Sequence, residues 1–475
     1  MSALFLAYQA LPFLLMAAAG LLLPLLAALA HRRFGVGLGV MAGVYLADTL
    51  WPNALGLNLG INLFLADFGL ALLALVAALR LASAGSGHPR AGAFYLLALI
   101  VALNLVQGLF LFKAAAGTAA RPTFYALSAC AYAMSFPMDK GRLAVLLEAF
   151  AWMSAALLLL VAWRGAAVAF DIRELLPPSG SFQPAGHSVW RVVASDASLV
   201  MAELGLSIWA WHAVAPRLRH WRFAAWLLAL VTLGLQHRSV WLAALVGLVT
   251  SLWLLREHGR RSGVWLWPVA GVLCLAAAGL ALDSGPGAAR QGVVRDIAIS
   301  ARDAVALQGT AADRLGSWRQ LVRQWADGGP RGLVLGAPFG TSMERYVSED
   351  LGAPKVAYQP HNYYVETLVS QGAVGLLAFL AMYLTAFRGL WRGRADDELG
   401  VAARWLMVLL AVQLAYFLTY GVEFLQLLVL GAALSLAARW RSAPAKAPAG
   451  ARPRMPMAAR RAAPKRSSRS AQRGG

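Results

Sequence analysis

The feature that most constrains this chain is a series of apolar stretches, most of which are long enough to cross a membrane. A spanning helix needs about 20 mostly apolar residues to traverse a hydrocarbon core of roughly 30 Å. Hydrophobic residues make up 60% of the chain and charged residues only 13%, so lipid rather than water must solvate much of it. The sequence therefore predicts an all-α, polytopic transmembrane helical bundle. The expected spans are 5–30, 34–51, 61–82, 91–113, 122–137, 143–164, 194–215, 222–236, 239–255, 263–282, 366–388, 401–419 and 422–439.

Three of these stretches, 34–51, 122–137 and 222–236, are short for a span, which leaves the expected count at about 12 or 13. The apolar run Phe223–Val249 is interrupted only at Gln236, His237 and Arg238. This run is too long for one span and predicts a tight helical hairpin.

Short basic loops alternate with less basic loops, and this alternation predicts the orientation. Short loops rich in Lys and Arg stay in the cytoplasm. The basic loops lie at 31–33, 88–90, 140–142, 217–222, 256–261 and 388–394. The loops at 52–60, 114–121, 165–193, Gln236–Arg238 and 283–365 are then external. The N-terminus, which is interpreted as the first span rather than a cleaved signal peptide, also comes out external.

The expected organisation has four parts. Residues 1–282 hold about ten spans by this reading, 283–365 form a long external loop with short helices, and 366–439 form the C-terminal spans. Residues 440–475 carry ten basic and no acidic residues, which is half of the net charge of +20. Their Pro-, Ala- and Ser-rich composition predicts a disordered cytoplasmic tail that sets topology or contacts anionic lipids, rather than nucleic acid.

Metal and disulfide chemistry are not expected. Cys130 and Cys274 lie within apolar segments and are interpreted as small buried hydrophobic residues. The long loop shows no cluster of His, Cys and carboxylates at metal-ligand spacing, so neither a metal nor a cofactor is predicted.

The long loop contains an amphipathic helix followed by a glycine-rich turn. Leu315, Trp318, Val322 and Trp325 recur at steps of three and four, and Asp327–Pro330 is a strong helix stop. This helix is either an interfacial helix or one whose arginines, Arg314 and Arg319 among them, bind a lipid phosphate through their planar guanidinium groups. The turn Gly336–Gly340 suits a close backbone approach to a ligand or to another helix.

Two further features lie near the expected membrane surface. Pro360 is suited to opening a helix, which would place His361 at the positive end of the helix dipole, where a neutral, base-competent ring is favoured. The alternative is an interfacial histidine that is hydrogen-bonded for structural reasons. Arg238, between two apolar segments, is either a functional charge near membrane depth or a side chain that reaches back to the interface.

These residues in this order resemble the O-antigen ligase and polymerase family. The resemblance rests on Arg238 before an apolar span, the stretch from Arg314 through Trp318, the glycine-rich turn, and His361-Asn362-Tyr363 leading into a Gly-interrupted span. By motif it covers roughly residues 220–440. The turn Gly336-Ala-Pro-Phe-Gly340 departs from the tighter Gly-x-Gly that is usual in the family, which argues against a phosphate role for it.

The resemblance implies a metal-independent glycosyltransferase of the bacterial inner membrane whose long loop is periplasmic. The implied donor is a glycan on undecaprenyl pyrophosphate, and the implied acceptor is lipid A-core, another lipid-linked repeat unit or a protein. Carried over residue by residue, His361 is the candidate base. Arg238 and Arg314 are the candidate pyrophosphate contacts, with Arg319 as a weaker third.

A transporter or flippase of lipid-linked glycans is the alternative. Transporters typically place ionisable residues near the membrane midplane on paired discontinuous spans. Here the distinctive residues gather mainly in one external loop, which favours the enzyme.

Overall fold

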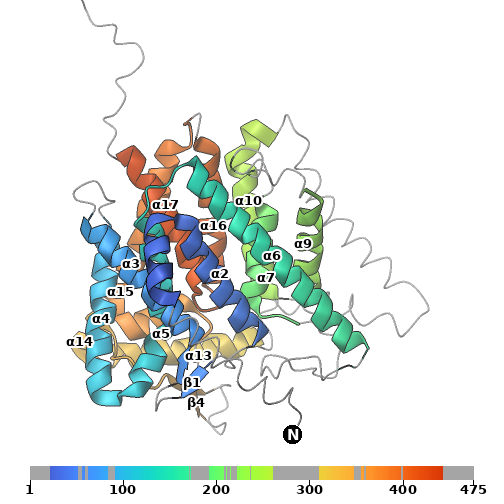
Figure 1. Cartoon of the computed structure of the whole chain (residues 1–475). Helices are drawn as coiled ribbons and strands as arrows, with labels where there is room; N and C mark the ends of the chain where they lie inside the picture. Colours follow the sequence, from blue (N-terminus) through green and yellow to red (C-terminus); the bar gives the residue numbers. More distant parts are fainter. Residues whose placement is uncertain are drawn as a thin grey trace, which may run out of the picture. The chain divides into compact units, whose positions relative to one another are not determined.

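A computed structural model shows a helical protein in which strands form only two short hairpins among the described residues (Figure 1). This confirms the predicted all-α class. The structure describes residues 22–51, 56–58, 62–83, 91–170, 192–207, 222–235, 237–259, 310–346, 355–357, 360–396 and 399–441, with single positions at 172, 210 and 214. The N-terminal part of the first expected span, the span at 263–282, the loop segment 283–309 and the tail from 442 lie outside these residues.

The N-terminal helices follow the predicted spans closely. They are α2 (Phe34–Leu50), α3 (Leu65–Ser83), α4 (Gly92–Phe112), α5 (Ala114–Met134), α6 (Lys140–Ala169) and α7 (Ser195–Leu206). A helix also covers Leu22–Arg32, and a hairpin of β1 (Gly56–Asn58) and β2 (Asn62–Phe64) precedes α3. The predicted loop at 114–121 is wrong. The chain reverses within Lys113 (φ 51°) instead, so α5 begins at Ala114.

The C-terminal helices include the predicted hairpin. It consists of α9 (Arg222–Gly234) and α10 (Arg238–Gly259). The remaining helices that follow the long loop are α15 (Tyr363–Gly393), α16 (Gly400–Tyr416) and α17 (Phe424–Arg441). Helix α10 packs along α16. Helix α15 bends at Gly372 (φ 70°), which separates a short first segment from the long apolar one.

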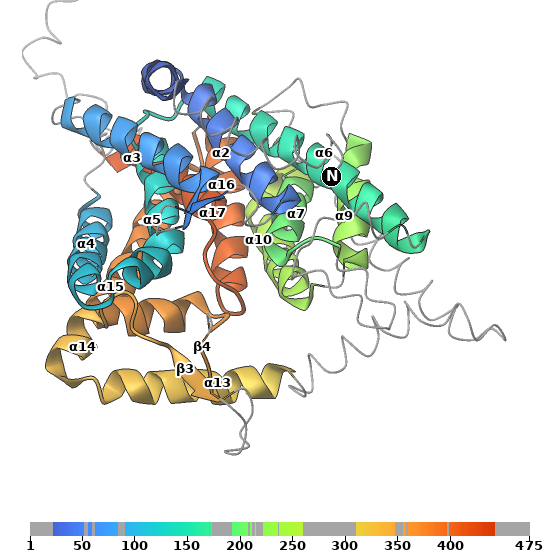
Figure 2. The ribbon, with the colours of Figure 1, turned by 60° about the horizontal axis from the view of Figure 1, so that its bottom comes forward.

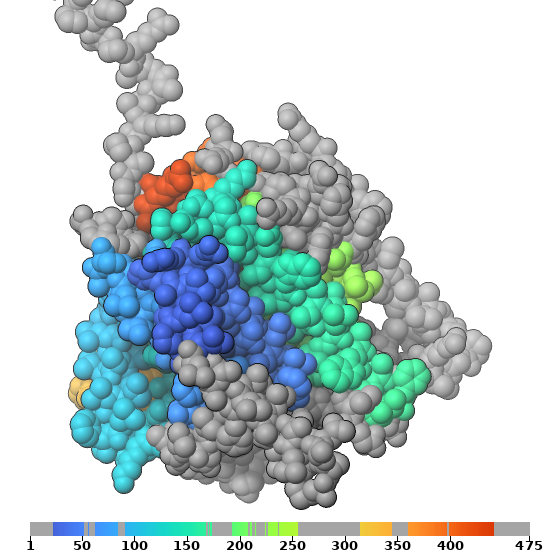
Figure 3. All heavy atoms as spheres, viewed as in Figure 1, coloured from blue at the N-terminus to red at the C-terminus, as the bar shows by residue number. Residues whose placement is uncertain are grey.

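Four helices are long and apolar enough to cross a membrane, within the part of the chain that is described. They are Leu65–Ser83, Gly92–Phe112, Lys140–Ala167 and Tyr363–Gly393. Large apolar side chains remain exposed on all four, such as Phe110 on α4 (84% exposed) and Leu159 on α6 (75%). Helices α4 and α6 lie on the face seen in Figure 3. Exposed apolar area of this extent is expected where lipid is the solvent.

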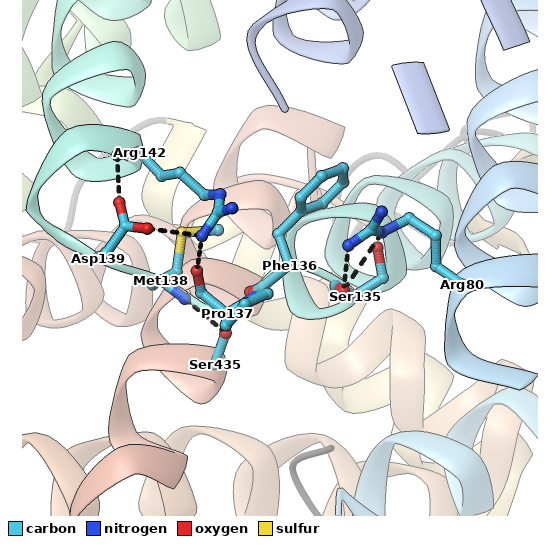
Figure 4. Close-up of polar contacts among 8 residues, drawn as sticks. All are labelled: Arg80, Ser135, Phe136, Pro137, Met138, Asp139, Arg142 and Ser435. Carbon is cyan, nitrogen blue, oxygen red and sulfur yellow. Dashed lines mark hydrogen bonds and ion pairs between the residues drawn. The ribbon is translucent and has the colours of Figure 1, made fainter. Parts of the chain in front are cut away.

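The described basic loops gather at one end of the helices. Arg80, near the end of α3, donates to the carbonyls of His31 and Ser135. Beside it, Arg142 donates to the Pro137 carbonyl (2.6 Å) and to Asp139 (2.6 Å) (Figure 4). The guanidinium of Arg80 lies 3.7 Å from the centre of the Phe136 ring. We call this end, defined by Arg80, Arg142 and Phe136, the basic end.

The described part of the long loop lies at the other end. It comprises α13 (Thr310–Ala326), α14 (Gly329–Leu335) and a hairpin of β3 (Glu344–Tyr346) and β4 (Lys355–Ala357). Figure 2 shows α13 and α14 lying across the ends of the other helices, next to the first segment of α15. Helix α13 confirms both the predicted amphipathic helix and its stop near Asp327.

Candidate functional site

Asn362 defines the start of α15. Its side chain accepts hydrogen bonds from the backbone N–H groups of Tyr364 (3.0 Å) and Val365 (3.1 Å). This is the usual N-cap arrangement, in which a side-chain oxygen satisfies N–H groups that have no partner inside the helix. The prediction that Pro360 opens the helix is therefore wrong, because the helix begins at Tyr363. His361 lies just before the cap, still near the positive end of the helix.

The backbone around His361 is held on both sides. The Trp318 indole N–H on α13 donates to the Pro360 carbonyl at 2.7 Å. The Tyr363 N–H donates to the carbonyls of Phe417 (2.9 Å) and Tyr420 (3.1 Å) in the α16–α17 loop. Between these anchors His361 adopts φ 50°, a left-handed conformation that few residues other than glycine take. Such a conformation persists where the surrounding structure enforces it, and it is more frequent at functional sites.

Tyr420 lies between His361 and Arg314. The rings of His361 and Tyr420 meet edge to face with centroids 5.5 Å apart. The guanidinium carbon of Arg314 lies 5.5 Å from the centre of the same Tyr420 ring. Arg314 also donates to the Thr419 carbonyl at 3.3 Å. The α16–α17 loop thus brings together the candidate base and one candidate phosphate contact, which are 47 positions apart in the sequence.

Arg238 lies at this same end, because it begins α10. Its neighbour His237 hydrogen-bonds through Nε2 to the Val193 carbonyl at 3.0 Å. Ser195 follows Val193 by two positions, and its hydroxyl lies 2.8 Å from the Tyr416 hydroxyl. The Tyr416 ring stacks on Tyr420 with centroids 5.2 Å apart. A continuous path of contacts therefore connects the start of α10 to the ring that His361 touches.

Arg319 and the glycine-rich turn behave differently from this group. Arg319 is exposed on α13, whereas Arg314 is half-buried. The turn approaches another helix: a Cβ on Gly336 would lie 2.4 Å from the Gln371 backbone nitrogen, and one on Gly372 would lie 2.3 Å from the Val334 carbonyl oxygen. Of the two interpretations of this turn, the structure supports the packing one.

Sequence reasoning missed Tyr420, which organises the site. It lies in a short connection between two apolar helices, and no local pattern distinguishes it from other interfacial tyrosines. The capping residue Asn362 had a signal, because Asn before a helix start is a preferred cap. Within the described residues no group of three His, Cys, Asp or Glu side chains could hold a metal ion.

Comparison with known proteins gives one match. No curated protein matches the sequence. Residues 223–380 match a family model described as O-antigen ligase, and this range includes Arg238, Arg314 and His361. Together with the four helices able to cross a membrane, the match supports a membrane glycosyltransferase-like role in surface polysaccharide biosynthesis. The match over residues 223–380 supports an assignment to the O-antigen ligase and polymerase family.

Proposed function

We propose that this protein transfers or polymerises glycan from an undecaprenyl-pyrophosphate donor at the periplasmic side of the bacterial inner membrane. The observation that carries the proposal is the convergence of His361 and Arg314 on Tyr420. A base and a permanent cation that contact the same ring supply the two groups that transfer from a pyrophosphate requires. The acceptor is lipid A-core, another lipid-linked repeat unit or a protein.

The chemistry is a displacement at the anomeric carbon of the donor sugar. His361 takes the proton of the acceptor hydroxyl, and that oxygen forms a bond to the anomeric carbon. The bond between this carbon and the phosphate oxygen breaks, and its electron pair leaves with the pyrophosphate. Charge builds up on the leaving group, and cationic donors placed there in advance stabilise that charge in the transition state.

The arginines supply these donors. Guanidinium groups bind phosphate oxygens through two parallel hydrogen bonds, which the ammonium of lysine cannot match. Arg314 is the first contact, because it is adjacent to His361 through Tyr420. Arg238 approaches from the start of α10, and Arg319 is a weaker, exposed third. No metal is needed in this scheme, because the arginines neutralise the pyrophosphate.

The test is transfer by purified protein supplied with a lipid-linked glycan. His361→Ala should lower the rate roughly 100-fold or more, which is the usual contribution of a positioned acid–base group. Arg238→Lys should also lower it, and a chelator should change nothing. His31→Ala, a matched substitution at the basic end, should leave the rate unchanged.

Product size separates ligation from polymerisation. Near wild-type transfer by His361→Ala would remove the base assignment. If the protein instead moves a fluorescent lipid-linked glycan between leaflets of a vesicle without any transfer, the transporter alternative replaces the enzyme.

A further inference from the structure

A cleft of about 330 Å³ lies at the end of α13 that is remote from Arg314. Its walls come from the end of α13, the start of α14, the turn after it, the first segment of α15 and one residue of α5. The lining is largely apolar, and it includes Phe339, Met343 and Val369. A mostly apolar cleft with a few polar groups is the usual form of a small-molecule site.

Two polar atoms at this cleft are buried and have no hydrogen-bond partner among the described residues. They are Oε2 of Glu366 on α15 and the indole Nε1 of Trp325 on α13. Buried polar atoms are nearly always paired, and an unpaired carboxylate oxygen is especially costly. Both residues line the same cleft, so an acceptor and a donor without partners there indicate a ligand that both donates and accepts.

The cleft favours hydroxyl groups over phosphate. When it is ionised, the Glu366 carboxylate would repel an anion, and its oxygens accept strongly from O–H donors. The positive charge in the lining, Arg331, already donates to the side-chain oxygen of Gln107. Sugar hydroxyls both donate and accept, and the C–H faces of a sugar ring suit the apolar walls. Glycan is thus the ligand chemistry that fits.

The cleft also lies where an extended glycan would reach. From Arg314 to Trp325 is eleven positions along α13, or about 16 Å at 1.5 Å per residue. Along α15, Glu366 follows His361 by five positions. Because Trp318 bonds to Pro360, α13 and the first segment of α15 lead together from the candidate catalytic residues to the cleft.

We propose that this cleft is a glycan-binding subsite, in which Glu366 and Trp325 hold a sugar residue remote from the bond that reacts. The proposal rests on the proposed function, because it assigns the cleft to the glycan of the same reaction. That glycan belongs either to the donor or to the acceptor. The same hydroxyl chemistry serves both.

Binding is tested apart from catalysis, with oligosaccharides released by mild acid from the surface polysaccharide of cells that carry the protein. Saturation-transfer NMR should show binding to the wild type and equally to His361→Ala. Glu366→Gln and Trp325→Phe should each weaken it about tenfold, the scale of one lost hydrogen bond to a charged or buried group. Arg323→Gln, an exposed control on α13, should bind normally. Inorganic phosphate should not compete.

Stability and kinetics complete the test. A merely structural Glu366 would make Glu366→Gln less stable, whereas removal of an unpaired buried charge should keep or raise the Tm. In transfer assays the two variants should raise KM for full-length glycan but not for a single-sugar donor. Varying donor and acceptor length separately shows which of them occupies the cleft.

The outcomes separate the two proposals. Oligosaccharide binding that depends on Glu366 and Trp325 without any transfer would remove the proposed function and leave the subsite standing. Transfer with unchanged KM and unchanged binding in both variants would overturn the subsite alone. Competition by inorganic phosphate would also overturn it, because it would show an anion site.

Discussion

Arginines at the two ends of the helices have opposite surroundings. At the basic end, the guanidinium of Arg80 lies over the Phe136 ring and donates to two backbone carbonyls, while Arg142 pairs with Asp139 and a third carbonyl (Figure 4). At the loop end, Arg314 makes one hydrogen bond within the described part of the chain, to the Thr419 carbonyl at 3.3 Å. Both Arg80 and Arg314 rest against an aromatic ring.

The difference separates a structural arginine from one that is available for a ligand. A guanidinium carries five N–H donors. Arg80 uses several of them to hold helix ends together, so its charge serves the fold. Among the described residues, most donors of Arg314 have no partner, which fits the phosphate contact that we propose for it. The number of arginines in a region therefore does not locate a site. The hydrogen bonds that each guanidinium already makes within the protein do.

Among the arginines, Arg314 should produce the largest effect on activity when it is removed. Hydrogen bonds to charged groups contribute about 1.5–3 kcal/mol, so Arg314→Ala should lower kcat/KM for transfer roughly tenfold to 100-fold. Arg314→Lys should recover only part of this loss, because lysine lacks the two-pronged geometry. Thermal stability should hardly change. A large fall in Tm with normal transfer per folded molecule would show that Arg314 is structural, and the contrast between the two ends would disappear.

Removing Arg80 should have the opposite signature. Arg80→Ala leaves the carbonyls of His31 and Ser135 without their donor, which should cost about 1–3 kcal/mol of stability. Transfer per folded molecule should stay at the wild-type level. Thermal unfolding of the purified protein in detergent, beside its transfer rate, measures both quantities. Loss of transfer at unchanged Tm would mean that the basic end also takes part in the reaction.

Arg319 should produce the smallest effect. It lies on the same helix as Arg314 but is exposed, and interactions of exposed charges are weakened by solvent and salt. Arg319→Lys should lower transfer about twofold, consistent with an exposed contact of at most about 1 kcal/mol. The loss should shrink further at high salt. A loss of transfer as large as that of Arg314→Lys would show that the burial of an arginine does not predict its effect on transfer.

The helices could be predicted well because each carries its own signal. The hairpin of α9 and α10 was expected at 222–236 and 239–255 and is found at Arg222–Gly234 and Arg238–Gly259. The errors occur at helix ends, whose positions depend on the turns between helices. The reversal at Lys113 has no Gly or Pro to mark it, and the start of α15 depended on the cap at Asn362 rather than on Pro360. Apolar length predicts a helix, but its ends depend on single backbone angles.

The sequence by itself determined the membrane class, the amphipathic α13 and the identity of His361 and Arg314 as candidates. Composition and helical periodicity are local properties, and so is a histidine that precedes an apolar helix. The tertiary structure decided which candidates meet. Tyr420, Glu366 and Trp325 gain their roles only because the α16–α17 loop returns to His361 and because α13 packs along α15. These contacts join residues far apart in the chain, and no local sequence pattern predicts contacts between such remote residues.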